Sequence, residues 1–250
     1  MADPNPPTGQ RSEELTAEDL LVDSFFPPIP FDDKEAMEAA ERPKSEKAHE
    51  LMDKDPTLPF ISAYIIAGDI LSGERAMKMM EAGVAYERAI MYVGSYARLD
   101  VSVRAQEAGY LNRDELLEEL PDLWRGSDPD DCDPRFLTLW HEAWVRNGRK
   151  TICDGRPLPA RTLRIYRGQD ALPDDYKPDP DRLPIGIAWS LDKAVALKFA
   201  NGAAIRVHRR PNPVMIHAKV DRKSVYAYLT LRNEQEVVVN PFNIRESADG

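Results

Sequence analysis

Two glutamates, one residue apart, stand directly before a run of valines near the C-terminus. Glu234 and Glu236 flank Gln235 in the stretch YLTLRNEQEVVVNP, residues 228–241. On a β-strand, residues i and i+2 point to the same face, so we expect the two carboxylates to lie together and repel each other. Such a pair is useful where a cation or a developing positive charge must be stabilised. A solvated strand edge is the alternative interpretation.

An arginine followed by a glycine ends an earlier strand-like segment, TLRIYR, residues 162–167. The guanidinium of Arg167 could hold a phosphate through two parallel hydrogen bonds, and Gly168 would let a ligand approach the backbone closely. Taken alone, an ordinary strand-end arginine is the simpler interpretation.

A third segment, GIAWSLDKAVALKFA, runs from Gly186 to Ala200 and predicts the end of a strand leading into a short helix. We expect Ser190 to cap this helix, Asp192 to lie in its first turn, and Asn201-Gly202 to end it. The helix start offers free N–H groups and Phe199 offers an aromatic ring, although plain packing is the alternative interpretation.

The elements that position these residues fall into two regions. Apolar residues at spacings of three and four predict helices across residues 57–125, with Asn112 as one N-cap, and over residues 135–146. The apolar face of the helix over residues 135–146 is expected to contain Phe136, Leu139, Trp140, Ala143 and Trp144. Alternating patterns predict strands around residues 162–167, 214–220 and 237–239. Helices followed by strands indicate an α+β fold.

Composition divides the chain further into three parts. Residues 1–45 are rich in Pro, Asp and Glu and predict a flexible arm, with LTAEDLLVDSFF as a possible short helix. Residues 46–160 form the predicted helical lobe and residues 161–245 the predicted β-rich core. Because the linker DGRPLPA is short, we expect the lobe to pack on the sheet.

The composition is that of a soluble globular protein, with 42% hydrophobic and 30% charged residues. No apolar run approaches the roughly 18–20 residues that span a bilayer, and the N-terminus lacks the features of a secretory signal. Cys132 and Cys153 have no zinc or disulfide spacing and suit a reducing cytoplasm. We therefore expect a cytoplasmic protein, or one delivered into a host cytoplasm, with no membrane partner.

The net charge of −10 argues against general nucleic-acid binding. Residues 161–223 are an exception, with 13 Lys and Arg against 7 Asp and Glu. This segment could favour a compact anion such as a nucleotide, or it could be a solvated basic face.

Several common sites are not indicated. The acidic run DPDDCD, residues 128–133, lacks the glycine and the final glutamate of a calcium loop, so a solvated loop that starts a helix is expected there. The sequence HEAWV at His141 is not a zinc-protease motif, and neither a GxGxxG nor a phosphate-binding P-loop motif is present. We expect no metal.

Taken together and in this order, the three segments resemble the R-S-E class of mono-ADP-ribosyltransferases, which includes clostridial-type toxins and arginine-modifying enzymes. The match covers about residues 161–242 and consists of Tyr166-Arg167-Gly168, Ala188-Trp189-Ser190 with Ala196 and Phe199-Ala200, and Glu234-Gln235-Glu236 before three valines. The helical region is similar to the helical lobe that precedes the sheet in many such toxins. One departure is Ala188, where the family has a serine that supports the catalytic glutamate; Ser190 aligns with the last serine of that motif.

The resemblance implies a mixed or antiparallel β-sandwich after a helical lobe, with NAD as the ADP-ribose donor and no metal. Cleaving the nicotinamide–ribose bond passes through an oxocarbenium-like state, as in glycoside hydrolysis. The resemblance gives Glu236 the task of stabilising that charge and of holding the ribose 2′-hydroxyl. Arg167 would clamp the pyrophosphate, Gly168 would bind the nicotinamide amide, and Phe199 would pack near the nicotinamide. The implied NAD-binding residues are Tyr166, Arg167, Gly168, Trp189, Ser190 and Phe199.

In the same family, a glutamate at the position of Glu234 goes with arginine as the acceptor, so Glu234 would orient the acceptor and help to deprotonate it. Residues 228–234 would then contact a target protein, as in a bacterial or phage effector. Two alternatives remain open. The first is an NAD glycohydrolase, with water as the acceptor, and the second is a degenerate binding module with this fold, which the alanine at position 188 motivates.

Overall fold

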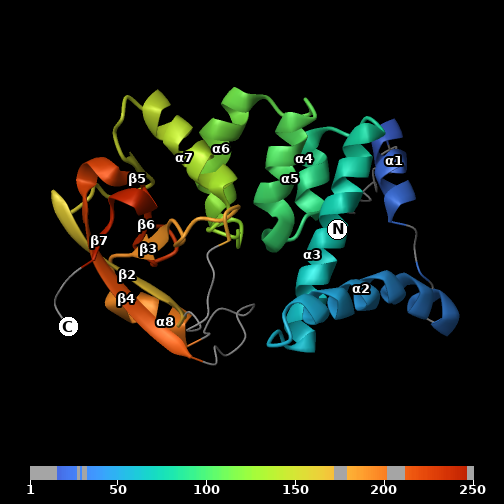
Figure 1. Cartoon of the computed structure of the whole chain (residues 1–250). Helices are drawn as coiled ribbons and strands as arrows, with labels where there is room; N and C mark the ends of the chain where they lie inside the picture. Colours follow the sequence, from blue (N-terminus) through green and yellow to red (C-terminus); the bar gives the residue numbers. More distant parts are fainter. Residues whose placement is uncertain (1–15, 27–28, 30–32, 172–178, 202–211, 247–250) are drawn as a thin grey trace, which may run out of the picture.

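The computed structural model describes residues 16–26, 29, 33–171, 179–201 and 212–246 of the 250-residue chain. Helices occupy the N-terminal part and a β-sheet the C-terminal part (Figure 1). The predicted α+β class is confirmed. No helix in the described ranges is long and apolar enough to cross a membrane.

The N-terminal part is a succession of helices. They are α1 (Ala17–Phe25), α2 (Lys34–Lys54), α3 (Phe60–Glu81), α4 (Tyr86–Ala89), the 3-10 turn η1 (Ile90–Tyr92), α5 (Ser95–Glu107), α6 (Arg113–Arg125) and α7 (Pro134–Arg146). Their starts follow from local chemistry. Thr16 and Asn112 form capping boxes, and the predicted cap at Asn112 is confirmed. Asp133 caps α7, with Pro134 in its first turn.

The predicted arm over residues 1–45 is wrong for its last part. Helix α2 begins at Lys34 and continues through Pro43 in its interior. Its apolar contacts with α3 form a small separate cluster that includes Ala48 and Ile66. These contacts stabilise a helix that its polar, proline-containing sequence alone does not predict. The short helix expected in the arm is present as α1, and residues 1–15 lie outside the described residues.

The strands are β1 (Ile152–Cys153), β2 (Thr162–Asp170), β3 (Ala188–Ser190), β4 (Pro213–Asp221), β5 (Val225–Leu229), β6 (Glu236–Val239) and β7 (Arg245–Glu246). They form one mixed sheet in the order β1-β5-β6-β3-β2-β4-β7, in which the pair β1 and β5 is parallel and the other pairs are antiparallel. The expected sandwich is therefore wrong, because the described strands belong to one sheet. Between β4 and β5 lies the 3-10 turn η2 (Arg222–Ser224), and η3 (Pro241–Asn243) follows β6.

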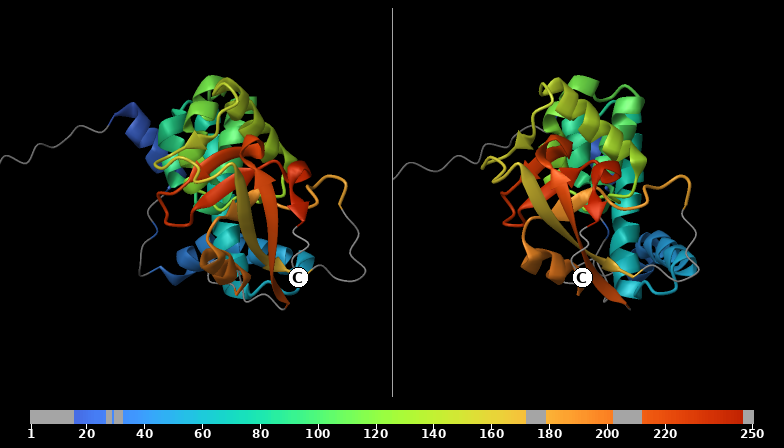
Figure 2. Two further views of the ribbon diagram at one scale, coloured as in Figure 1. Left: turned by 90° about the vertical axis from the view of Figure 1, so that its left-hand side faces the viewer. Right: turned by 60° about the vertical axis from the view of Figure 1, so that its left-hand side comes forward.

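The sheet packs on two clusters of apolar side chains. The larger cluster joins helices α3, α5, α6 and α7 to the sheet residues Ala227, Leu229 and Val238. The second cluster contains Ile165, Trp189 and other residues of the sheet. Helices α6 and α7 lie along one end of the sheet, and α8 (Lys193–Ala200) packs against β2 at the other (Figure 1, Figure 2). Of the predicted α7 face, Phe136, Leu139, Trp140 and Ala143 are buried, while Trp144 is partly exposed.

The connection between α6 and α7, residues 126–133 (the α6–α7 loop), reaches back to the sheet. Its backbone accepts hydrogen bonds at Asp131 from Ile187 (3.1 Å) and at Cys132 from Leu183 (2.8 Å). The loop therefore lies against the segment that leads into β3.

Candidate active site

The three segments singled out in the sequence lie on three adjacent strands. Tyr166 of β2 lies opposite Ser190 of β3, and Ser190 lies opposite Glu236 of β6. Residues that are separated by up to 70 positions thus form one row across the sheet. Nothing in the local sequence requires β3 to pair with both β2 and β6. The strand order therefore supports, independently of the sequence pattern, the view that the three segments form one site.

Glu236 begins β6 and is held by a residue of the helical lobe. The indole Nε1–H of Trp124, on α6, donates a hydrogen bond of 2.7 Å to Oε1 of Glu236. Burial raises the pKa of Glu236 from 4.5 to about 7; the carboxylates of Glu234 and Asp131 add to this, and the Trp124 bond opposes it. The carboxyl therefore changes charge near neutral pH.

Glu234 lies in the turn before β6 and not on the strand. Asn233 and Gln235 both adopt left-handed backbone conformations, with φ of 59° and 46°. The expectation that Glu234 and Glu236 share a strand face is therefore wrong, because Gln235 turns the chain between them. Burial raises the pKa of Glu234 as well, and Asp128 adds to this, while Arg232 opposes it.

Ser190 fixes this turn from the neighbouring strand. Its hydroxyl donates to the carbonyl oxygen of Glu234 (2.6 Å) and accepts from the backbone N–H of Asp192 (2.9 Å). The expectation that Ser190 caps α8 is wrong, since Asp192 is the N-cap and accepts from Ala194 (2.7 Å). Ser190 instead connects the start of α8 to the Glu234 turn. At the other end of the helix, Asn201 is the C-cap, and Gly202 lies outside the described residues.

Arg167 is paired with a carboxylate inside the protein. Its Nη1 lies 2.5 Å from Oδ2 of Asp131 and its Nη2 lies 3.0 Å from Oδ1, and both side chains are 17% exposed. Nη1 also donates to the carbonyl oxygen of Ala188 (2.7 Å), and Nε donates to Gln169 (3.3 Å). Burial alone would lower the pKa of Arg167, but Asp131 raises it above its usual value. The guanidinium of Arg167, which was expected to bind a pyrophosphate, thus already binds Asp131.

The Asp131 carboxylate is fixed from a second direction, because Oδ2 also accepts the backbone N–H of Ala188 at 3.0 Å. Gly186 leaves the space for this pair, since a Cβ at that position would lie 2.3 Å from Asp131 and 2.4 Å from Arg167. The prediction of a solvated acidic loop is wrong at Asp131. The prediction that the run starts a helix is confirmed, because Asp133 is the N-cap of α7.

Gly168 has a packing role in this structure. A Cβ there would lie 2.1 Å from the carbonyl oxygen of Ala196 and 2.2 Å from the backbone nitrogen of Ala200, so its absence lets α8 approach β2. On α8, Phe199 is 37% exposed. Trp189 is buried in the second core cluster and donates to the carbonyl oxygen of Gly186 (3.0 Å), which places its ring in the core and not on an exposed wall.

Two residues of this site were not identified from the sequence. Trp124 sits on the apolar face of α6, where nothing in its spacing separates it from a core residue. Asp131 was assigned to a solvated acidic run. Position 188, where the resemblance leads us to expect a serine, is an alanine, and the Trp124 indole supplies a donor to Glu236 from another part of the chain.

Among the described residues, one group of metal-ligand types comes together, with ligand atoms of Asp130, Asp131 and Cys132 within 4.8 Å of one another. Both oxygens of Asp131 already accept from Arg167, and Asp130 accepts from Arg182 (2.7 Å). These carboxylates therefore form ion pairs with arginines in this structure.

Comparison with protein-family models, with curated proteins and with solved structures finds no match to this chain.

Proposed function

We propose that the chain is an NAD-dependent mono-ADP-ribosyltransferase that transfers ADP-ribose to a protein side chain, with arginine as the acceptor. The observation that supports it is the row of Tyr166, Ser190 and Glu236 across β2, β3 and β6. Three motifs that resemble the family in sequence order are also neighbours in space.

In this proposal Glu236 stabilises the positive charge that develops on the ribose as the bond to nicotinamide breaks. Only the ionised carboxylate can do this, because the neutral acid carries no compensating charge. The burial that raises its pKa also strengthens its interaction with a charge formed beside it. Trp124 favours the ionised form and fixes one oxygen, so that the other remains for the ribose 2′-hydroxyl.

Arg167 binds the pyrophosphate in this proposal, which requires Asp131 to leave its position. The guanidinium makes three hydrogen bonds with Asp131 and with the Ala188 carbonyl oxygen. An incoming nucleotide would therefore compete with these acceptors. The phosphate oxygens would replace the carboxylate as acceptors of the same planar donors. The α6–α7 loop, which carries Asp131, would have to move for the nucleotide to bind.

The turn before β6 is the proposed contact with the acceptor. It presents Glu234 half-buried, held through its carbonyl oxygen by Ser190, next to the exposed residues 231–233. A carboxylate with a raised pKa can accept a proton from an incoming guanidinium. This supports arginine as the acceptor and a target protein as the partner.

The test is incubation of the full chain with NAD labelled in its adenylate part and a cell lysate, with protein labelling and nicotinamide release measured together. Wild type is expected to label protein. Glu236→Gln is expected to lose the labelling, while Glu118→Gln, which changes an exposed glutamate of α6, is expected to keep it. If wild type neither labels protein nor releases nicotinamide, the proposal is refuted. Release of nicotinamide without labelled protein would point instead to an NAD glycohydrolase.

A second candidate is a binding module with this fold and no transferase activity. The Asp131–Arg167 pair favours it, because a guanidinium satisfied internally needs no nucleotide. Calorimetry separates the two candidates. A binding isotherm for NAD that is lost in Arg167→Gln supports the transferase, and the absence of NAD binding supports the module.

A further inference from the structure

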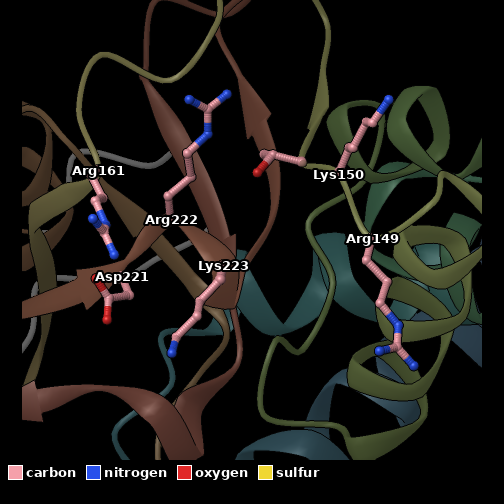
Figure 3. Close-up of a pocket in the computed structure, with 7 residues that line it drawn as sticks. Arg149, Lys150, Arg161, Asp221, Arg222 and Lys223 are labelled. Atoms are coloured by element: carbon pink, nitrogen blue, oxygen red, sulfur yellow. The ribbon is translucent and has the colours of Figure 1, made fainter.

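A second candidate site, which is positively charged, lies at the end of the sheet near η2. A pocket of about 630 Å³ is lined by Arg149, Lys150, Thr151, Arg161, Asp221, Arg222 and Lys223 (Figure 3). We call it the basic pocket. Its size is within the range of about 300–1,000 Å³ that is typical of small-ligand sites.

Three segments that are distant in sequence build its walls, and backbone hydrogen bonds hold each of them. Arg149 donates to the carbonyl oxygen of Trp144 at the end of α7 (2.9 Å), and Arg222 donates to that of Arg161 (2.8 Å). The hydroxyl of Thr151 donates to the carbonyl oxygen of Val225 (3.1 Å). The backbone positions of the charged residues are thus fixed by the fold.

The cations around the pocket outnumber the acids. Five of the seven lining residues are cations, all of them exposed, and no ion pair joins any of the five to a residue within the described ranges. Asp221 is the single acid among the lining residues, and the hydroxyl of Thr162 donates to it (3.4 Å). In a chain of net charge −10, this gathering of cations creates a local positive potential that attracts anions.

The basic pocket is separate from the candidate active site. Arg161 directly precedes β2, whereas Arg167 lies six residues further along the same strand, which corresponds to roughly 20 Å at 3.3 Å per residue. The further site therefore does not depend on the proposed transfer reaction.

We infer that the basic pocket binds a compact anion that carries several phosphate groups. In Figure 3 the charged side chains point in different directions and do not meet at one point: Arg222 and Lys150 extend to one side, and Lys223 and Arg149 to the other. Cations spread around a hollow suit several linked phosphates better than a single phosphate. Arginine and lysine together provide both planar and point-charge donors for phosphate oxygens.

A nucleic-acid strand presents the same phosphate chemistry but fits less well. Its backbone continues beyond the pocket and would meet the rest of an acidic protein, whose net charge of −10 repels it. The occupant we propose is therefore confined to the pocket, such as a polyphosphate or the phosphate end of a nucleotide.

The experiment is isothermal titration of the full chain with inorganic tripolyphosphate at 50 and 200 mM NaCl. We expect saturable one-site binding that weakens at the higher salt concentration. Two double variants remove charges from different parts of the pocket: Arg222→Gln with Lys223→Gln from one segment, and Lys150→Gln with Arg161→Gln from the other two. Each is expected to weaken binding by about tenfold or more, because a hydrogen bond to a charged group accounts for roughly a decade of affinity.

The matched control is Lys78→Gln with Lys193→Gln, which removes the same charge from exposed positions on α3 and α8 and should leave the affinity within about twofold. Thermal unfolding of each variant shows that it is folded. The inference is overturned if wild type does not bind tripolyphosphate, or if both pocket variants bind as well as the control does. It is also overturned if the chain binds a single-stranded 12-nucleotide DNA that tripolyphosphate does not displace.

Discussion

Replacing Trp124 with phenylalanine removes the one indole N–H that donates to Glu236 and keeps an aromatic ring in the same place. Trp124 is 3% exposed and packs edge-on against Phe136 and Trp140, with ring centroids 6.2 and 5.7 Å apart. Its hydrogen bond to Glu236 is 2.7 Å long. Because that bond stabilises the charged carboxylate, its loss should raise the pKa of Glu236 further.

The size of this effect follows from the energy of the bond. A hydrogen bond to a charged group contributes about 1.5–3 kcal/mol, and each 1.36 kcal/mol corresponds to one pKa unit, so the pKa should rise from about 7 to about 8–9. At pH 7 the ionised fraction would fall from about one half to roughly 1–10%. Any reaction that needs the carboxylate should slow by about 5–50-fold at pH 7 and recover at higher pH.

Two measurements report this change. The pH dependence of nicotinamide release from NAD should keep its shape, with the rising limb displaced upward by about one to two pH units. A ¹³C NMR titration of the glutamate side-chain carboxyls gives the pKa directly and does not depend on catalysis. Glu236→Gln identifies the signal in that spectrum.

The matched control is Trp140→Phe. Trp140 lies in the same core and is fully buried, but its Nε1 has no hydrogen-bond partner among the described residues. Both variants lose similar packing, and Trp124→Phe alone loses a donor to Glu236. The expected role of Trp124 is refuted if the two variants give the same pH profile, or if the Glu236 signal titrates in Trp124→Phe as it does in wild type.

Three further outcomes are expected. Asp131→Asn should lower the free energy of unfolding in urea by about 3–5 kcal/mol, because Arg167 loses its charged partner, and should tighten ADP-ribose binding in calorimetry; unchanged stability would contradict the pairing. Gly168→Ala should reduce stability by about 1–3 kcal/mol, seen as a lower urea midpoint at constant slope, because the added Cβ meets the backbone of α8. The folded chain binds the proton of Glu236 more tightly than the unfolded chain does, since the pKa rises from 4.5 to about 7. Stability should therefore fall by up to about 3 kcal/mol as pH rises across that window, and a pH series that is equally steep in Glu236→Gln would refute this.

Local sequence patterns predicted the parts of the fold that depend on local chemistry. The cap at Asn112 was predicted, and so was a short helix after β3, although Asp192 and not the expected Ser190 caps it; both caps are side chains that bind nearby backbone groups. The alternation in β4 and the valines of β6 predict strands, and both strands are present; the three valines of β6 are buried. These features need no knowledge of which elements pack together.

The parts that could not be predicted depend on contacts between distant segments. The row of Tyr166, Ser190 and Glu236 became visible only through the strand order. Trp124 and Asp131 are distant in sequence from their partners, and an apolar helix face or an acidic run gives no sign of such a contact. The left-handed conformation of Gln235 was also unforeseen, because glutamine has no preference for it.

The contacts that cross from the helices to the sheet bear on how the chain unfolds. The largest apolar cluster contains residues from both parts, and the α6–α7 loop is joined by backbone hydrogen bonds to the segment before β3. A cut near residue 160 would leave Trp124 and Asp131 on one fragment, and Glu236 and Arg167 on the other. Each fragment would then hold a buried charge or an apolar face without its partner. The helices and the sheet are therefore expected to unfold as one cooperative unit in a single transition, and the candidate site should be lost in that same transition.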